Sequence, residues 1–215
     1  ADYPQPVALS KERRKELLQL AETYNFAIVE IDDQHEFRYS NAQSPLIANT
    51  KTNRVIYVST ISSTLHFQLA RTIIVGSESF IKNLKKITAS RCDSHAKIND
   101  KILAKAISEN VISAHVSRLY HQYCEQRKQL SELADWYLKT KVDYQPPDSG
   151  RHAWLSLKRP VSSRCLHEIF HHSGLCMPHH VCIRRPKTYK SLRVSFATLK
   201  VKEMEESFRQ IAHII

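Results

Sequence analysis

The sequence predicts an α/β fold built on a mostly parallel sheet. Two short apolar runs, residues 55–58 and 72–75, are rich in β-branched residues and flank a turn rich in Ser and Thr, which predicts two buried strands. A third run, residues 26–31, follows an amphipathic helix, and buried strands that alternate with helices favour a parallel sheet. Because ligands of such sheets bind at the carboxyl ends of the strands, we expect chemistry after Ile31 and around Ser62 and Ser63.

The first helix is expected to begin after Ser10, which is a typical N-cap residue, and to end at Asn25. At helical spacing its apolar face holds Leu17, Leu18, Ala21 and Tyr24. A polar connection follows the strand at 26–31 and carries Asp32, Asp33, His35, Glu36 and Arg38. Such a cluster suits a metal site or acid–base chemistry, although solvated loop charges are the commoner explanation.

The rest of the chain predicts more helices and then a small α+β layer. Ser77 or Ser79 caps a helix, and a helical region at 96–139 is broken near Glu109 and Asn110. After a turn cluster at 144–150 we expect strand 153–157, helix 163–172, strands 177–184 and 192–197, and helix 202–214. This order divides the chain into a sheet domain at 1–95, linking helices at 96–140 and a small C-terminal domain at 141–215.

The composition indicates a globular protein. Of the 215 residues, 42% are hydrophobic and 25% are charged, which is close to ordinary usage. The formal net charge of +11 attracts anions, either nucleic acid or a small anionic ligand. The chain has only three glycines, too few for a dinucleotide-binding fingerprint or a P-loop.

We expect a cytoplasmic location without membrane contact. No apolar run approaches the length of a membrane span, and the first residues lack the order of a secretory signal. The five cysteines are odd in number and are not spaced as a small disulfide scaffold. Reduced thiols in a reducing compartment are therefore expected.

Several motifs occur in a fixed order: EFRY at 36–39, VIYVSTISSTL at 55–65, a helix with His115, Arg118, Tyr120 and Arg127, and LRVSFA at 192–197. With these motifs the chain resembles, from about Tyr3 to Ile215, the second half of the aminotransferase-like domain of MocR/GabR-type transcriptional regulators of the GntR family. The resemblance implies part of a fold-type-I, pyridoxal-phosphate-dependent aminotransferase-like large domain, followed by a small α+β domain. Those regulators also carry a winged helix-turn-helix domain, which the 215 residues do not include.

The resemblance implies a degenerate site for the cofactor ring. Where the family reads EDDYDSEFRY, the first Asp pairs with the pyridinium nitrogen and the Tyr contacts the ring oxygen. Here these positions are Ile31 and Asp33. We expect that Asp32 cannot substitute for the first Asp, because a one-residue offset along a strand directs a side chain to the other face.

The covalent and phosphate contacts of the family are also altered. The Schiff-base lysine of the family falls on Ser63, next to Ser62, and a hydroxyl cannot form the imine. The phosphate-binding arginine falls on Ala70, with Arg71 one residue late. We therefore expect no catalytic residue and no bound cofactor, although pyridoxal phosphate is the cofactor of the family.

Arg193 matches the arginine that binds a substrate carboxylate in family members. A guanidinium suits a carboxylate because its parallel donors reach both oxygens. Arg193 could therefore bind a carboxylated effector, or it could be held in a structural salt bridge.

Metal-capable side chains are dense in one segment, which contains Cys165, His167, His171, His172, Cys176, His179, His180 and Cys182. No CxxC pair is present, so a structural zinc site is not favoured. The string HEIFH at 167–171 spells the zincin pattern, with Glu168 as the base that would activate water, but a five-residue pattern also arises by chance. We expect no metal. The serines lack the GxSxG elbow of a hydrolase, and residues 94–139 lack the pattern of a DNA-recognition helix.

These observations predict an effector-sensing and dimerisation domain of a MocR/GabR-type regulator, without transaminase turnover. The expected partners are a second copy of the chain, a small carboxylated effector, and DNA only through a separate winged-helix domain. An active pyridoxal-phosphate-dependent aminotransferase is the main alternative, and a zinc hydrolase that uses HEIFH is a weaker one.

Overall fold

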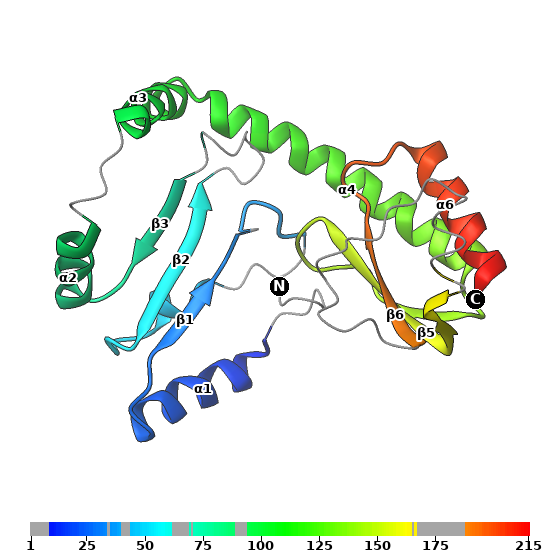
Figure 1. Ribbon diagram of the computed structural model, residues 1–215, viewed down its shortest axis with the longest axis horizontal. Coiled ribbons are helices and arrows are strands. Elements are labelled where there is room, and N and C mark those ends of the chain that lie inside the picture. Colours follow the sequence, from blue (N-terminus) through cyan, green and yellow to red (C-terminus); the bar gives the residue numbers. More distant parts are fainter. Residues whose placement is uncertain are drawn as a thin grey trace. The chain divides into compact units, whose positions relative to one another are not determined.

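The computed structural model describes residues 9–33, 35–39, 44–61, 69, 71–88, 94–164, 166 and 188–215. The chain forms two compact units, with the boundary between Tyr120 and His121 (Figure 1). This boundary falls inside the linking segment predicted at 96–140. The predicted three-part division itself stays a prediction.

The first unit contains a three-stranded sheet in the order β1-β2-β3, formed by β1 (Ile28–Ile31), β2 (Val55–Ile61) and β3 (Arg71–Val75). β1 and β2 are parallel, as predicted, whereas β3 runs antiparallel to β2. The connection from β2 to β3 is shorter than the dozen or so residues that a parallel crossover needs, which explains the direction of β3. β3 was also expected to be buried, but all its residues after Arg71 are exposed.

Helix α1 (Lys11–Thr23) packs on one face of this sheet (Figure 1). Ser10 caps it by accepting a hydrogen bond from the Arg13 N–H, and Asn25 follows it with a φ of 55°, which ends the helix as predicted. The core combines Ala21 of α1, Ile28 of β1, Val55 of β2 and Leu46 of the 3₁₀ helix η1 (Leu46–Asn49). Tyr24 was expected on the apolar face but is 71% exposed, because it lies beyond the last helical turn.

The opposite face of the sheet is apolar and open among the described residues. Strand register places Val29, Ile31 and Ile74 on this face, and their exposed fractions are 56%, 68% and 38%. Helix α2 (Glu78–Thr88), which Ser77 caps through the Phe80 N–H, buries none of its side chains. The described part of the first unit therefore covers one face of its sheet and leaves the other accessible.

The long helical region forms two helices, α3 (Ser94–Ser108) and α4 (Val111–Tyr137), in agreement with the predicted break near Glu109 and Asn110. Asn110 has a φ of 58°, a left-handed conformation that asparagine tolerates better than most residues. No described helix is long and apolar enough to cross a membrane.

The second unit contains an antiparallel sheet in the order β4-β5-β6, formed by β4 (Val142–Tyr144), β5 (His152–Ser162) and β6 (Thr188–Ser195). A register shift between Ser156 and Val161 marks a bulge in β5. Helix α6 (Val201–Ile214) follows β6, close to the predicted helix. The fully buried side chains of this unit include Leu130, Leu138, Leu155, Leu166, Phe196, Met204 and Phe208. The strand predicted at 177–184 and most of the helix predicted at 163–172 lie outside the described residues.

Replacing Leu155 with Ala should lower the free energy of unfolding of the second unit by about 2–5 kcal/mol, because the leucine side chain is fully buried and its loss leaves a cavity. Both tryptophans, Trp136 and Trp154, lie in this unit, so urea unfolding followed by tryptophan fluorescence reports on it. Val201→Ala is the matched control, since Val201 is 47% exposed, and should change stability by less than about 0.5 kcal/mol. An equal loss in both variants would contradict the assigned core.

Candidate functional site

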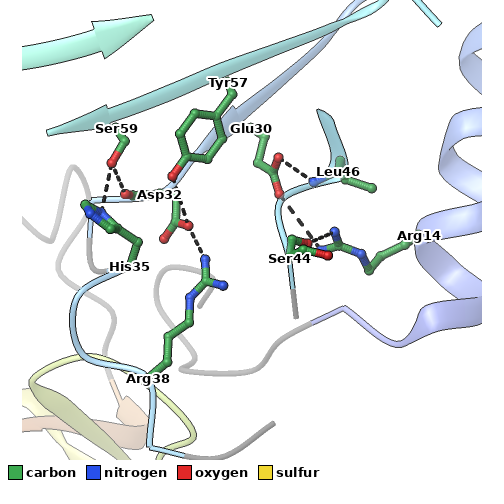
Figure 2. Close-up of polar contacts among 9 residues, drawn as sticks. All are labelled: Arg14, Glu30, Asp32, His35, Arg38, Ser44, Leu46, Tyr57 and Ser59. Atoms are coloured by element: carbon green, nitrogen blue, oxygen red, sulfur yellow. Dashed lines mark hydrogen bonds and ion pairs between the residues drawn. The ribbon is translucent and has the colours of Figure 1, made fainter. Parts of the chain in front are cut away.

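Polar side chains gather where β1 and β2 end, as the sequence predicted (Figure 2). Asp32 follows β1 directly, and its N–H donates to the Val58 carbonyl at 2.8 Å, which continues the parallel pairing for one more residue. Tyr57 and Ser59 alternate along β2 and point to the same face of the sheet, toward Asp32. This face of the strand ends forms the first half of the candidate site.

Asp32 is the centre of a network on this face. Its carboxylate pairs with the Arg38 guanidinium and accepts a hydrogen bond from the Tyr57 hydroxyl at 3.4 Å. Only 12% of the Asp32 side chain and 24% of the Arg38 side chain are exposed, so solvent screens this ion pair only partly. Burial, with the nearby Asp32 charge as a smaller cause, raises the pKa of Tyr57, and the phenol therefore remains a donor at neutral pH.

Ser59 and His35 form a pair that resembles a nucleophile with its base. The Ser59 hydroxyl donates to the Asp32 carbonyl at 2.8 Å, and its oxygen lies 3.0 Å from the His35 Nδ1. A serine hydroxyl has one proton, so with that proton on the carbonyl, His35 must be the donor in the second bond. His35 therefore cannot take the serine proton in this arrangement, and the pair holds the loop in place rather than activating a nucleophile.

Asp33 is directed to the other face of the sheet. Its carboxylate accepts a hydrogen bond from the Thr60 hydroxyl at 3.1 Å, and Thr60 is the neighbour of Ser59 along β2. Because successive strand residues point to opposite faces, Thr60 and Asp33 lie away from the Asp32 network. Ile31 shares their face through its register with Val58. Asp32 and Ile31 therefore lie on opposite faces of the strand end.

The predicted cofactor positions do not all come together among the described residues. Arg71 is paired with Ile61 across the sheet, which places it on the face of Ser59 and not on that of Asp33. Its Nε also lies 2.6 Å from the Asp100 carboxylate of α3. Arg71 therefore does not share the face of Ile31 and Asp33. Ser62, Ser63 and Ala70 lie outside the described residues.

Sequence reasoning missed Glu30, whose carboxylate is part of the same strand end. It accepts a hydrogen bond from the Leu46 N–H at 2.8 Å and lies 3.9 Å from an Arg14 nitrogen, so it joins β1 to η1 and α1 (Figure 2). Burial raises the pKa of Glu30 in spite of these partners. A single acid within the apolar run at 26–31 was the signal that could have revealed it.

Two of the motifs that carry the family resemblance meet inside the first unit. The rings of Tyr39, from the EFRY motif, and Tyr120, from α4, have centroids 5.9 Å apart and are tilted by 31°. Phe37 of the same motif is fully buried. On α4, an Arg118 nitrogen lies 3.1 Å from the His115 Nδ1. These contacts give the motif residues a packing role, which sequence alone did not assign.

Arg193 lies in the second unit, on β6 opposite Trp154, and is exposed. Arg127, another motif residue, donates from Nε to the Pro147 carbonyl at 2.7 Å and so fastens α4 to the turn before β5. The described residues contain no group of three metal-capable side chains, and the segment with HEIFH and the neighbouring cysteines lies outside them, apart from Leu166.

The chain is similar in sequence to aminotransferases and to regulators. It is 24% identical over 215 residues to aromatic-amino-acid aminotransferase 1 of Thermococcus litoralis, covering 99% of this chain and 51% of the relative. It is 21% identical over 213 residues to the HTH-type transcriptional regulator YdfD of Bacillus subtilis, and 29% identical over 140 residues to the probable rhizopine catabolism regulatory protein MocR of Rhizobium meliloti. The match to YdfD covers 99% of this chain and 44% of YdfD. The match to MocR covers 62% of this chain and 28% of MocR. No protein-family model matches the chain.

Solved aminotransferase structures share the fold. The multiple substrate aminotransferase of Thermococcus profundus superposes with a TM-score of 0.84 at 24% identity, over 99% of this chain and 53% of that one. The kynurenine aminotransferase of Pyrococcus horikoshii, solved with PMP, gives 0.84 at 22% identity, over 98% of this chain and 53% of that one. The chain is thus an aminotransferase-like domain of the α/β, fold-type-I class, and it spans about half the length of the curated relatives that it matches.

These similarities overturn the expectation that no cofactor is bound. The aminotransferase relatives match at least as well as the regulators, and the fold is that of pyridoxal-phosphate-dependent enzymes. Ile31 and Ser63 bear on individual contacts, and losing a contact does not abolish a binding site that the rest of the fold forms. A pyridoxal phosphate cofactor is consistent with this chain.

The two adjacent aspartates should respond differently to the same change. Asp32→Asn removes the charge that pairs with partly buried Arg38 and should destabilise the first unit by about 1–3 kcal/mol. Asp33→Asn, at an exposed position, should change stability by less than about 0.5 kcal/mol. Hydrogen exchange of peptides that cover β1 and β2 measures both. Equal effects would show that the two side chains are not held on opposite faces.

Glu30 makes the stability of the first unit depend on pH. Its folded-state pKa lies above the ordinary value of 4.5, so the folded chain holds this proton to higher pH than the unfolded chain. The stabilisation that comes from the protonated Glu30 side chain is complete below the ordinary pKa of Glu30, and it is lost as pH rises through the folded-state pKa. Glu30→Gln should therefore flatten the decrease in stability from pH 4.5 upward, measured by hydrogen exchange of the β1 peptide. An unchanged pH profile would contradict this assignment.

Proposed function

We propose that the chain is the effector-sensing and dimerisation domain of a MocR/GabR-type transcriptional regulator. In this proposal it binds pyridoxal phosphate without a covalent bond and does not turn over amino acids. DNA is bound by a separate winged-helix domain, and the functional unit is a homodimer. The regulators YdfD, MocR and YhdI among the relatives support the regulatory role, YdfD over almost the whole chain.

The proposed absence of turnover rests on the environment of Ile31. This residue stands where the resemblance implies the carboxylate for the pyridinium nitrogen, and its apolar side chain is 68% exposed. The neighbouring carboxylate of Asp32 is held on the opposite face by Arg38 and Tyr57. A protonated ring nitrogen makes the cofactor an effective electron sink, so losing its partner weakens catalysis more than binding.

The donor set on the Ile31 face still fits a cofactor ring. Asp33 is exposed and directed to this face, where Thr60 holds its carboxylate. The resemblance implies a contact with the ring oxygen at this position, and a carboxylate here would accept a hydrogen bond from the ring hydroxyl. When bound, pyridoxal phosphate supplies an aldehyde that reacts with amino acids, and Asp33 with Thr60 would position the ring. We assign no phosphate ligand, because Arg71 points to the other face and pairs with Asp100.

An active aminotransferase is the second candidate. It is favoured by the aminotransferases of Thermococcus litoralis and Saccharolobus solfataricus, which match 99% and 100% of this chain. Such activity would require a lysine other than residue 63 to react with the cofactor. The HEIFH hydrolase alternative depends on residues outside those described.

The regulator and the aminotransferase predict different results when a covalent adduct of the cofactor is trapped by reduction. Pyridoxal phosphate added to the protein should give a reversible absorbance change, and borohydride reduction followed by peptide mapping should trap no adduct in the segment around Ser63. A Ser63→Lys variant should gain a trapped adduct at residue 63, because it restores the amine. Asp33→Asn should weaken cofactor binding several-fold in a fluorescence titration, whereas Asp143→Asn, an exposed carboxylate in the second unit, should leave it unchanged.

A stoichiometric adduct on a lysine of the unmodified chain, together with transfer of amino groups from amino acids to 2-oxo acids, would replace the regulator proposal with the enzyme. The absence of any binding of the cofactor would contradict the ring-positioning role proposed for Asp33. Sedimentation velocity tests the homodimer separately.

A further inference from the structure

A groove of about 610 Å³ lies along β4 in the second unit. Small-molecule sites in proteins have volumes of roughly 300–1,000 Å³, so the groove is large enough for a ligand. Its walls come from the end of α4, from the turn that follows β4 and from β5. None of its residues belongs to the strand ends of the first unit, and the groove is therefore separate from the candidate site described above.

The groove crosses the edge of β4, because its lining comes from both faces of that strand. β4 is an edge strand in the order β4-β5-β6. Val142 is buried in the core, and Tyr144, two residues further on, points to the same side. Asp143 points to the opposite side, where its register with Ser156 places it on the face of Trp154. A ligand in the groove therefore contacts both sides of the strand.

On the side of α4 the groove presents hydrogen-bond acceptors. Ser131 donates its hydroxyl proton to the Arg127 carbonyl at 3.0 Å, so Tyr144 must be the donor in its 3.2 Å hydrogen bond with Ser131. Burial raises the pKa of Tyr144, and the protonated phenol keeps its oxygen lone pairs for another donor. Asp135, whose charge is a smaller cause of the same pKa shift, makes no hydrogen bond or ion pair with the other described residues.

On the side of β5 the groove combines a carboxylate with an aromatic ring. The Asp143 carboxylate lies 3.9 Å from the Lys158 ammonium, and an exposed pair of this length contributes little stability. Lys158 also donates to the Lys139 carbonyl at 3.2 Å, so the carboxylate of Asp143 retains acceptor capacity. The ring of Trp154 is half-buried and offers both an apolar surface and a π face that attracts cations.

We propose that the groove binds an aliphatic diamine, with one ammonium group at Asp135 and the Tyr144 oxygen and the other at Asp143. The alkyl chain crosses the strand edge beside Trp154. An ammonium group has three donors and no acceptor, so it suits side chains that offer only acceptors. The formal net charge of +11 disfavours nonspecific attraction of a dication, and binding therefore depends on these local carboxylates. The diamine site is independent of the regulatory role proposed above.

A tryptophan-fluorescence titration of the chain with 1,4-diaminobutane tests the site, because a ligand beside Trp154 should change its emission. We expect the diamine to bind on the order of tenfold more tightly than 1-aminobutane, which lacks the second ammonium group. Asp135→Asn should weaken binding of the diamine on the order of tenfold, and Tyr144→Phe should weaken it several-fold. Glu132→Gln is the matched control, since it removes an exposed charge of α4 outside the groove, and it should leave binding unchanged.

Calorimetric titration gives a second readout that does not depend on tryptophan. Trp154→Phe should lose most of the fluorescence change and keep measurable binding, because a phenyl ring retains part of the apolar and cation–π contact. The absence of binding, or equal affinities for the diamine and 1-aminobutane, would overturn the proposal. Equal losses in Asp135→Asn and Glu132→Gln would overturn it as well, because they would show attraction by surface charge alone. Displacement of the diamine by an equal concentration of magnesium chloride would assign the groove to an inorganic cation instead.

Discussion

The parallel pairing of β1 with β2 is the constraint on which the candidate site depends. It joins Ile28 to Val55 and Ile31 to Val58, and the Asp32 N–H extends it past the end of the strand. Since side chains alternate along a strand, this register fixes the face of every residue that follows. A shift by one residue would exchange Asp32 with Asp33 and Glu30 with Ile31, and would turn Ile28 away from the core that it forms with Ala21 and Val55.

Charge is distributed over the two faces in a consistent way. The face that packs against α1 and η1 holds Glu30 and Asp32, and each of these carboxylates has an arginine and a hydrogen-bond donor close by. A carboxylate that is partly removed from water needs such partners, because an unpaired buried charge costs several kcal/mol. On the other face, exposed Asp33 accepts a hydrogen bond from the Thr60 hydroxyl and retains acceptor capacity for a ligand. Stability and binding therefore depend on different faces of one strand end.

The fold by itself leaves the function open. Aminotransferases and transcriptional regulators both match this chain at 21–29% identity, and a shared fold is compatible with either activity. In the proposed regulator the distinction depends on a few side chains at the strand ends, where the resemblance implies a carboxylate at Ile31 and an amine at Ser63.

Local features were predictable from the sequence because their causes are local. The Ser10 cap, the end of α1 at Asn25 and the break at Asn110 depend on the hydrogen-bonding and φ preferences of single residues. The strand positions followed from β-branched apolar runs in the same way. The direction and exposure of β3 were missed, because a short apolar run looks the same in a parallel buried strand and in an antiparallel exposed one.

The sequence alone thus determined most of the described helices and strands, the aminotransferase-like class and the place along the chain where polar residues follow the strands. Only the tertiary structure decided that Asp32 pairs with Arg38 while Asp33 turns away, and that Glu30 is held by Leu46 and Arg14. These are contacts between residues far apart in the chain or on alternate faces of a sheet. They follow from strand register and packing, which no local pattern of residues encodes.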